Sequence, residues 1–261
     1  MDPKPNHSRF FRSDTGKTML IPIDHGTLIP VPGLEDTGAL IERLKPFTDG
    51  FIVNLGVARA FAKELAGSAV VLRTDTGNTC VEGLQTDGSY RIWGPAEAAV
   101  IGAHGMMNMC FPGHSAEANI ISDCADLIAE SLSSPYPIML ETLPYGLGRG
   151  PDYTPEAIHY CIRLSCELGA DIVKTAYPGD KEAFRRSCEE AFAPVIVLGG
   201  ASGGSPREFL DPIADAMEAG AAGIAVGRNL WQAPDPVRMA KALNAIVHAE
   251  ATAEDAWRMS A

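Results

Sequence analysis

Lys174 stands in the middle of a segment whose other residues are typical of a buried strand. The segment, residues 171–177, reads DIVKTAY and follows a helical ending at Leu168-Gly169. Burying an ammonium group is costly, so a lysine in such a place either performs chemistry or is neutralised by a carboxylate. Burial lowers the pKa of a lysine and provides a free amine that attacks a carbonyl carbon to form a Schiff base. From the residues alone, catalysis and a structural ion pair both stay open.

Other groups with chemical potential follow the apolar runs of the chain. Asp24-His25-Gly26 ends the first run, and a glycine-rich stretch, residues 199–205 (GGASGGS), ends a later one. Glycine lets backbone N–H groups approach an anion closely, and an arginine adds a charged contact. We therefore expect a phosphate site formed by Gly199, Gly200, Ser202, Gly203, Gly227 and Arg228. The alternatives are a flexible turn beside an arginine paired with a helix carboxylate, and an Asp24 that only caps a turn.

The elements that must position these groups read as strands alternating with helices. Continuous apolar runs, typical of parallel strands covered on both faces, occur at residues 18–24, 50–54, 69–75, 105–111, 137–143, 171–177, 194–200 and 223–229. Amphipathic segments predict helices at residues 35–45, 94–103, 115–132, 154–168, 181–190 and 205–219, and residues 235–257 predict one or two closing helices. Residues 79–92 are polar and rich in turn formers, and we expect an elaborated loop there.

This alternation predicts an α/β protein, a single (β/α)8 TIM barrel over residues 1–261. An open doubly wound sheet is the alternative, although no GxGxxG follows the first strand. In a barrel, the carboxyl ends of the strands meet at one face. The groups after the predicted strands would therefore lie together: Asp24, Glu141, Lys174, Gly199 and Arg228.

Composition narrows the class of protein. The net charge is −12, from 21 basic and 33 acidic residues, which argues against a binder of nucleic acid or anionic membranes. The six cysteines form no CxxC pair, and the amino-terminal residues show no apolar leader, so we expect a cytoplasmic protein. The histidines lack metal-ligand spacing, and no metal is expected. Arg149 is a candidate for a second anion site or a solvated side chain.

Four motifs together resemble those of the archaeal-type class I fructose-bisphosphate aldolases. Their relatives include the 2-amino-3,7-dideoxy-hept-6-ulosonate synthases and the bacterial autoinducer-2 thiolase. The resemblance covers nearly the whole chain and rests on Asp24-His25-Gly26 with Pro32-Gly33-Leu34-Glu35, Ile172-Val173-Lys174-Thr175, Leu198-Gly199-Gly200, and residues 226–232 (VGRNLWQ). It implies a barrel without metal or other cofactor, Lys174 as the Schiff-base lysine and Asp24 near the substrate carbinol. It also implies phosphate on the loops after the seventh and eighth strands, and a homo-oligomer, often a decamer.

The chain departs from that family after the fifth predicted strand. Aldolase members carry a Tyr-Pro-Arg-Gly-like turn whose tyrosine transfers a proton, whereas this sequence has Leu143-Pro144-Tyr145-Gly146. Because strand side chains repeat every two residues, we expect Tyr145 to replace that tyrosine. Glu141, His25 and Tyr177 are the alternatives for proton transfer.

The resemblance therefore implies a lyase that cleaves or forms a C–C bond in a phosphorylated ketose such as fructose 1,6-bisphosphate. The expected catalytic residues are Lys174, Asp24 and Tyr145, and the expected binding residues are His25 and the six phosphate-site residues named above. One alternative is a thiolase or acetyltransferase of the autoinducer-2 type. Another is a catalytically silent regulator that binds sugar phosphates on the same barrel.

Overall fold

Eight parallel strands close into a barrel in the computed structural model, which describes residues 4–80, 88–199 and 204–261. Around the ring the strands follow the order β1-β10-β9-β8-β7-β6-β3-β2. Every pair of neighbouring strands in this ring is parallel. Their bounds are β1 Thr18–Pro22, β2 Gly50–Val53, β3 Ala69–Arg73, β6 Gly105–Cys110, β7 Ile138–Thr142, β8 Ile172–Thr175, β9 Val195–Leu198 and β10 Gly223–Ala225. This ring confirms the predicted barrel and rules out the open doubly wound sheet.

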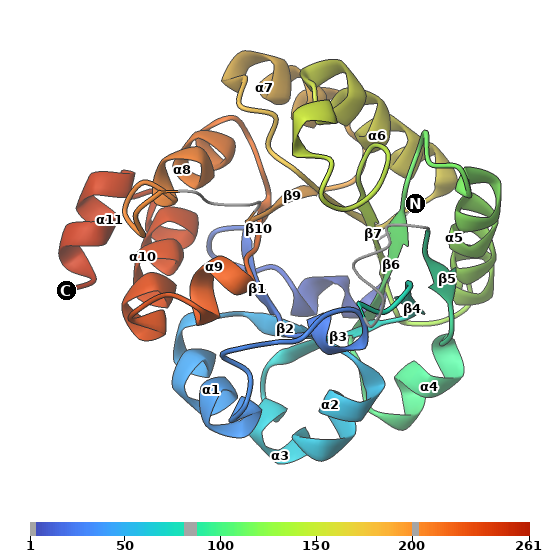
Figure 1. Ribbon diagram of the computed structural model, residues 1–261, viewed down its shortest axis with the longest axis horizontal. Coiled ribbons are helices and arrows are strands. Elements are labelled where there is room, and N and C mark those ends of the chain that lie inside the picture. The colour runs from blue at the N-terminus through green and yellow to red at the C-terminus, as the bar shows by residue number, and fades with distance from the viewer. Residues whose placement is uncertain (1–3, 81–87, 200–203) are drawn as a thin grey trace.

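Helices surround the barrel, as Figure 1 shows in the view down the ring. The predicted helices are present, several of them shorter than expected: α1 Thr37–Leu44, α4 Pro95–Val100, α5 Glu117–Ser131, α6 Pro155–Leu168, α7 Lys181–Glu190 and α8 Leu210–Glu218. The carboxyl-terminal segment forms two helices, α10 Pro236–Ala249 and α11 Ala253–Met259. Side-chain caps fix where two of the helices begin. The Thr154 hydroxyl accepts from the Ala157 N–H at the start of α6, and the Asp180 carboxylate accepts from the Ala183 N–H at the start of α7. No helix of the described residues has the length and apolarity needed to cross a membrane.

Four short elements escaped the sequence prediction. They are the helices α2 Leu55–Ala60, α3 Ala62–Leu65 and α9 Arg228–Trp231, and a hairpin of β4 Asp75–Thr76 with β5 Tyr90–Arg91. Each spans too few residues to show a helical or strand period. The hairpin matters for the site, because it places β4 against β6 and β5 beside α5 (Figure 1).

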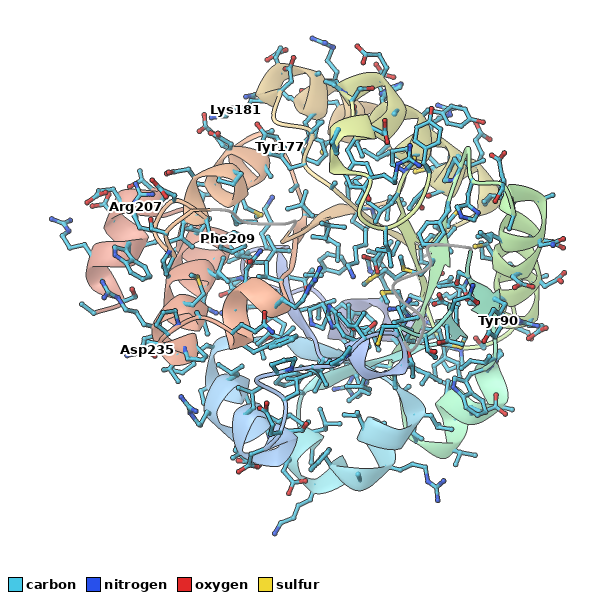
Figure 2. The ribbon with its side chains drawn as sticks, in the orientation of Figure 1. Tyr90, Tyr177, Lys181, Arg207, Phe209 and Asp235 are labelled. Carbon is cyan, nitrogen blue, oxygen red and sulfur yellow. The ribbon has the colours of Figure 1, made fainter. Side chains whose placement is uncertain are left out.

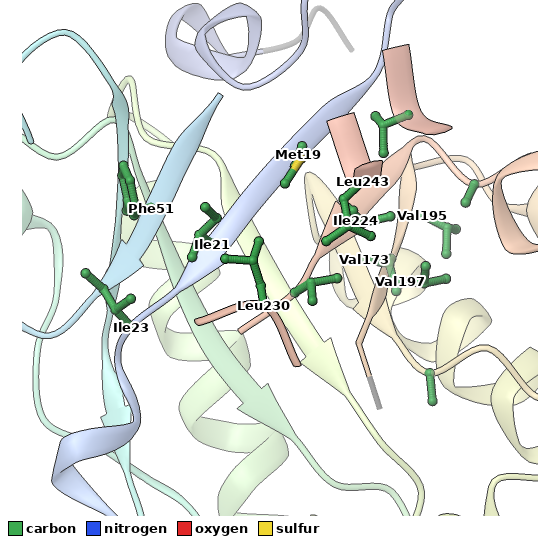
Figure 3. Packing of buried hydrophobic residues seen from close by; sticks show 14 of the residues in the cluster. Met19, Ile21, Ile23, Phe51, Val173, Val195, Val197, Ile224, Leu230 and Leu243 are labelled. Carbon is green, nitrogen blue, oxygen red and sulfur yellow. The ribbon is translucent and has the colours of Figure 1, made fainter. Parts of the chain in front are cut away.

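The buried side chains form two layers. The larger layer lies between strands and helices and includes Met19, Ile21 and Leu243, which Figure 3 shows packed together with residues of β8, β9 and β10. The smaller layer fills the interior of the barrel with Phe10, Leu20, Ile52, Ala69, Val71, Met107, Met139, Ile172, Ile196 and Ala225. Apolar side chains therefore fill the interior of the barrel away from the carboxyl ends of the strands, and the polar side chains gather at those carboxyl ends.

Candidate active site

A cavity of about 510 Å³ opens at the carboxyl ends of the barrel strands. Six of the residues predicted for the site line it: Asp24, His25, Lys174, Gly199, Gly227 and Arg228. Gly200, Ser202 and Gly203, predicted for the phosphate site, lie outside the described residues. The barrel therefore brings together groups that are up to about two hundred residues apart in the chain, as its closed topology requires.

Lys174 and Glu141 form a buried ion pair at the centre of this cavity lining. The two residues are directly opposite each other in the parallel pairing of β7 with β8. Lys174 Nζ lies 2.8 Å from Glu141 Oε2 and 3.8 Å from Met107 Sδ, with Lys174 only 4% exposed and Glu141 7% exposed. The charge of the buried lysine is thus balanced by a carboxylate, and both members of the pair line the cavity. The pair combines an amine with an adjacent acid–base group, which is what carbonyl addition needs.

A second buried network joins Asp24 to β3. Arg73 donates from Nη1 to Asp24 Oδ2 at 3.0 Å and from Nη2 to Asp75 Oδ2 at 3.2 Å. Asp75 also accepts from the Met109 N–H at 3.3 Å and from the Ser89 hydroxyl. All five groups are buried, so the guanidinium holds the Asp24 carboxylate at a fixed position beside the cavity.

The sequence prediction missed Arg73 and Asp75, although the signal was present. Both stand in or just after the apolar run AVVLRTD of residues 69–75, as Lys174 stands in DIVKTAY. The cost of burial that drew attention to Lys174 applies equally to an arginine flanked by apolar residues.

The charges of the cavity set the protonation of Asp24 and His25. Burial alone raises the pKa of Asp24, but the charges of Arg73, His25 and Lys174 outweigh it and hold the pKa below its ordinary value. Burial lowers the pKa of His25, and the nearby cations Lys174, Arg228 and Arg73 lower it further against the opposing charge of Asp24. Asp24 is therefore ionised and His25 neutral at neutral pH.

The ends of β9 and β10 form one side of the cavity. Asn229 Nδ2 donates to the Gly199 carbonyl at 3.0 Å, which ties the two strand ends together. Gly227 lies where a Cβ would come within 3.0 Å of both the Pro22 carbonyl oxygen and the His25 ring, so only glycine fits without displacement. Arg228, the next residue, is exposed and lines the cavity. The arrangement suits an anion held by a guanidinium beside glycine backbone.

The structure does not bring Tyr145 to this cavity. Strand β7 ends at Thr142, and Tyr145 has a φ of 62°, so the two-residue strand period does not reach it. Its side chain is 42% exposed and lies against Gly113 and below the Arg149 guanidinium. Leu143 is buried and lines the cavity in the position where the family carries its tyrosine.

Two other tyrosines have different positions. Tyr177 packs edge-on against Phe184 of α7, near Lys181 and away from the centre of the barrel (Figure 2). Tyr153, which the sequence prediction did not single out, lines the cavity and donates its hydroxyl to the Gly146 carbonyl at 2.6 Å. Burial raises the pKa of Tyr153 to about 12. Among the candidates for proton transfer, Glu141 and His25 line the cavity, and Tyr145 and Tyr177 are not among its lining residues in the described part of the chain.

Comparison with known proteins shows which sequences the chain resembles. The sequence profile of the DeoC/LacD family aldolases matches residues 18–233. A 2-amino-3,7-dideoxy-D-threo-hept-6-ulosonate synthase of Archaeoglobus fulgidus is 36% identical over 234 residues, covering 89% of this chain and 86% of its own. A 3-hydroxy-5-phosphonooxypentane-2,4-dione thiolase of Salmonella typhimurium is 30% identical over 260 residues, covering 97% of this chain and 84% of its own.

Solved structures with a similar fold include an aldolase. An archaeal fructose-1,6-bisphosphate aldolase, with its catalytic lysine bound to the carbinolamine intermediate of the substrate, superimposes with a TM-score of 0.81 and 27% identity. The match covers 93% of this chain and 98% of that structure. With a family profile that spans most of the barrel and relatives that cover nearly the whole chain, this protein belongs to the DeoC/LacD family of aldolases.

Proposed function

We propose that the chain is a class I aldolase that cleaves or forms a C–C bond in a phosphorylated ketose through a Schiff base at Lys174. The observation that carries the proposal is the buried Lys174–Glu141 pair on the wall of the cavity, with the two groups 2.8 Å apart. An amine next to a carboxylate can lose its proton locally and attack a ketone carbon. The relatives that share this fold include an aldolase whose lysine forms such an adduct.

In this proposal Glu141 is the principal proton-transfer group. It takes the proton from the Lys174 ammonium, and the free amine then adds to the substrate ketone. As the protonated acid it assists loss of water from the carbinolamine to give the iminium. Glu141 replaces Tyr145 in this role because it contacts the lysine, whereas Tyr145 lies outside the cavity lining.

Asp24 would act at the scissile bond and Arg228 at the phosphate. Asp24, kept ionised by Arg73, accepts the hydrogen bond of the hydroxyl whose proton is lost when the C–C bond breaks. His25 is its neutral neighbour, with Nδ1 3.5 Å from Asp24 Oδ1. Arg228, Gly199 and Gly227 would hold the phosphate and so fix the ketone beside Lys174.

Borohydride trapping tests the proposal directly. Incubation with dihydroxyacetone phosphate and sodium borohydride should reduce an iminium to a stable secondary amine, and peptide mass spectrometry should locate the added mass at Lys174. The Lys174→Met variant should give no adduct, and Lys241→Met, which changes a lysine on α10, should label like the wild type. Absence of an adduct at Lys174 in the folded wild type contradicts the mechanism.

A thiolase activity is the second candidate, because one relative has that activity by name and the same lysine and phosphate groups would serve it. Acetyl transfer from a phosphorylated diketone to coenzyme A, without aldol cleavage of any phosphorylated ketose, would select it. Phosphosugar binding without turnover in either assay would instead select a silent regulator.

A further inference from the structure

The cationic side chains that line the cavity differ in whether they have an ion-pair partner. Three lysine or arginine residues line it: Arg73, Lys174 and Arg228. Arg73 is bound by Asp24 and Asp75, and Lys174 is bound by Glu141. Arg228 has no ion pair with any residue in the described ranges 4–80, 88–199 and 204–261. Residues 1–3, 81–87 and 200–203 contain no lysine, arginine or histidine, so their side chains add no further cation.

The strand order sets the direction in which a bound substrate can extend. Strand β10 lies four positions from β6 in the eight-strand ring, so the two strands face each other across the barrel (Figure 1), and β8 with Lys174 lies on the arc between them. Arg228 follows β10, so a phosphate bound there extends the substrate past Lys174 toward the ends of β7 and β6. The part of the substrate beyond the scissile bond then lies at the β6–β7 side, opposite Arg228.

Most side chains on that side of the cavity are apolar; its polar side chains are those of Glu141 and Tyr153, and Gly148 and Gly150 contribute backbone alone. We call it the β6–β7 wall, defined by Met109, Phe111, Leu143, Leu147 and Pro151, all of which line the cavity. The charged side chain that β7 contributes is Glu141, a carboxylate, which repels a second phosphate. Tyr153 turns its hydroxyl to the Gly146 carbonyl.

Arg149 does not supply the missing charge. Its guanidinium is 52% exposed and pairs with Asp152 at 2.7 Å, and Arg149 is not among the lining residues found in the described chain. A phosphate dianion placed against the β6–β7 wall would lose its hydration without gaining a cation, and that is strongly unfavourable. An apolar group in the same place gains contact and loses no hydrogen bond.

We propose that the substrate ketose carries a single phosphate, on the ketone side of the scissile bond, and that the other product is an aldehyde with an apolar chain. The inference rests on the proposed function and narrows its substrate. It sets aside a bisphosphate such as fructose 1,6-bisphosphate, whose second phosphate would have to meet the β6–β7 wall.

The reaction balances as a retro-aldol step. The Lys174 amine and the ketone form an iminium and release one water. A base then takes the proton of the β-hydroxyl group, the C–C bond breaks, and its electron pair flows to the iminium nitrogen to give a neutral enamine and the free aldehyde. Protonation of the enamine carbon and addition of one water return the amine and release the phosphorylated ketone.

Aldol synthesis tests the inference in the easier direction. Purified wild-type protein is given dihydroxyacetone phosphate with isobutyraldehyde or glyceraldehyde 3-phosphate, and kcat/KM is measured for each aldehyde. We expect the apolar aldehyde to be favoured at least about tenfold, the size of effect that apolar pocket contacts give. A preference for glyceraldehyde 3-phosphate would overturn the inference.

A matched pair of variants tests whether the β6–β7 wall sets the preference between the two aldehydes. Leu147→Arg places a cation on the β6–β7 wall, where Leu147 is half-buried, and should shift the preference toward glyceraldehyde 3-phosphate by at least about tenfold. Leu132→Arg adds the same charge at the end of α5, where Leu132 is 66% exposed, and should leave the preference unchanged. An equal shift in both variants would mean that overall charge, not the wall, sets the preference.

Failure of the inference is distinguishable from failure of the proposed function. If borohydride traps dihydroxyacetone phosphate at Lys174 but glyceraldehyde 3-phosphate is the better partner, the Schiff-base mechanism stands and the single-phosphate inference falls. If no adduct forms at Lys174, both fall together.

Discussion

At the scale of single residues, the Lys174–Glu141 pair explains how a lysine is tolerated inside a barrel. Neighbouring positions on parallel strands bring the ammonium and the carboxylate within 2.8 Å, so the burial cost of each charge is offset by the other. Ion pairing and catalysis are thus not competing explanations for this lysine. The same carboxylate that neutralises it is placed to accept its proton.

Replacing Glu141 by glutamine should therefore impair chemistry more than binding. The amide keeps the shape but cannot take a proton from Lys174, and we expect kcat to fall by about 100-fold or more, with a smaller change in KM. Steady-state kinetics with the preferred aldehyde measures this. Glu130→Gln, on the exposed face of α5, is the matched control and should keep wild-type kcat. An unchanged kcat in Glu141→Gln would remove Glu141 from the mechanism.

Arg73 should control the ionisation of Asp24. The charges of Arg73 and Lys174, together with that of His25 in acid where it is protonated, hold the pKa of Asp24 below its ordinary value against the effect of burial. Removing the Arg73 charge in Arg73→Met raises that pKa, so the acidic limb of the kcat/KM profile should move to higher pH. Arg73→Lys keeps the charge and should move the limb less.

Circular dichroism checks that both Arg73 variants fold, because Arg73→Met leaves two buried carboxylates without their partner. A folded Arg73→Met protein with an unshifted acidic limb would show that Asp24 does not set that limb.

Residue identity in the sequence was informative wherever a charge interrupts an apolar run. Lys174 was found in this way, and Arg73 carried the same signal at the end of its run. The sequence alone could not predict that Lys174 pairs with Glu141, because the register of β7 against β8 is set by the closed barrel. Tyr145 was misplaced for a related reason: its left-handed backbone, at φ 62°, ends the strand period that the prediction assumed.

At the scale of elements, the amino-terminal segment closes the lower end of the barrel. The short helix η1, Pro5–Arg9, precedes Phe10, which is 1% exposed and packs with the interior layer of the barrel. Lys4 Nζ anchors the segment through an ion pair with Asp171 at 3.0 Å. A segment outside the strand and helix repeat thus completes the interior core.

Phe10→Ala should be strongly destabilising. Removing a fully buried phenyl ring leaves a cavity, and the free energy of unfolding should fall by about 3–5 kcal/mol. Urea unfolding followed by circular dichroism measures the change. Phe192→Ala, at a ring that is 62% exposed and lies beneath the Arg163 guanidinium, should cost less than about 1 kcal/mol. Comparable losses in the two variants would contradict the role of Phe10 in the core.

The elements that the sequence predicted are the long ones with a clear period or an apolar run. Strand β6 and helices α5, α6 and α7 all appeared within a few residues of their predicted bounds. The single turns α2, α3 and α9 have four to six residues each, too short for hydrophobic periodicity to distinguish them from loop. The β4–β5 hairpin was hidden because its strands have two residues each and pair across a long intervening segment.

At the scale of the whole molecule, stability and chemistry occupy opposite ends of the barrel. Below the interior layer, Asp49 accepts hydrogen bonds from Arg12 Nε at 2.6 Å and the Met19 N–H at 2.7 Å. His248 of α10 lies 3.0 Å away through Nε2, and its Nδ1 contacts Thr15. This network joins the amino-terminal segment, β1, β2 and α10 at the end far from Lys174.

Asp49 should make stability depend on pH. Burial raises the pKa of Asp49, but hydrogen bonds from His248, Arg12 and the Met19 amide outweigh it and leave the pKa below 3.8. A lowered carboxyl pKa contributes stability above the unfolded value and loses it as the pH falls through the folded value. Asp49→Asn should therefore unfold at lower urea than wild type at neutral pH, and the difference should shrink in acid. A constant difference at all pH values would contradict this.

The separation of the two ends has an evolutionary consequence. Substitutions in the loop after β7 alter the β6–β7 wall without touching the Asp49 network or the Phe10 core. Mutations can then change the aldehyde preference with little loss of folding stability, because the groups that keep the barrel folded are remote from those that select the substrate. Relatives with different named activities on this one fold are the expected outcome of such modularity.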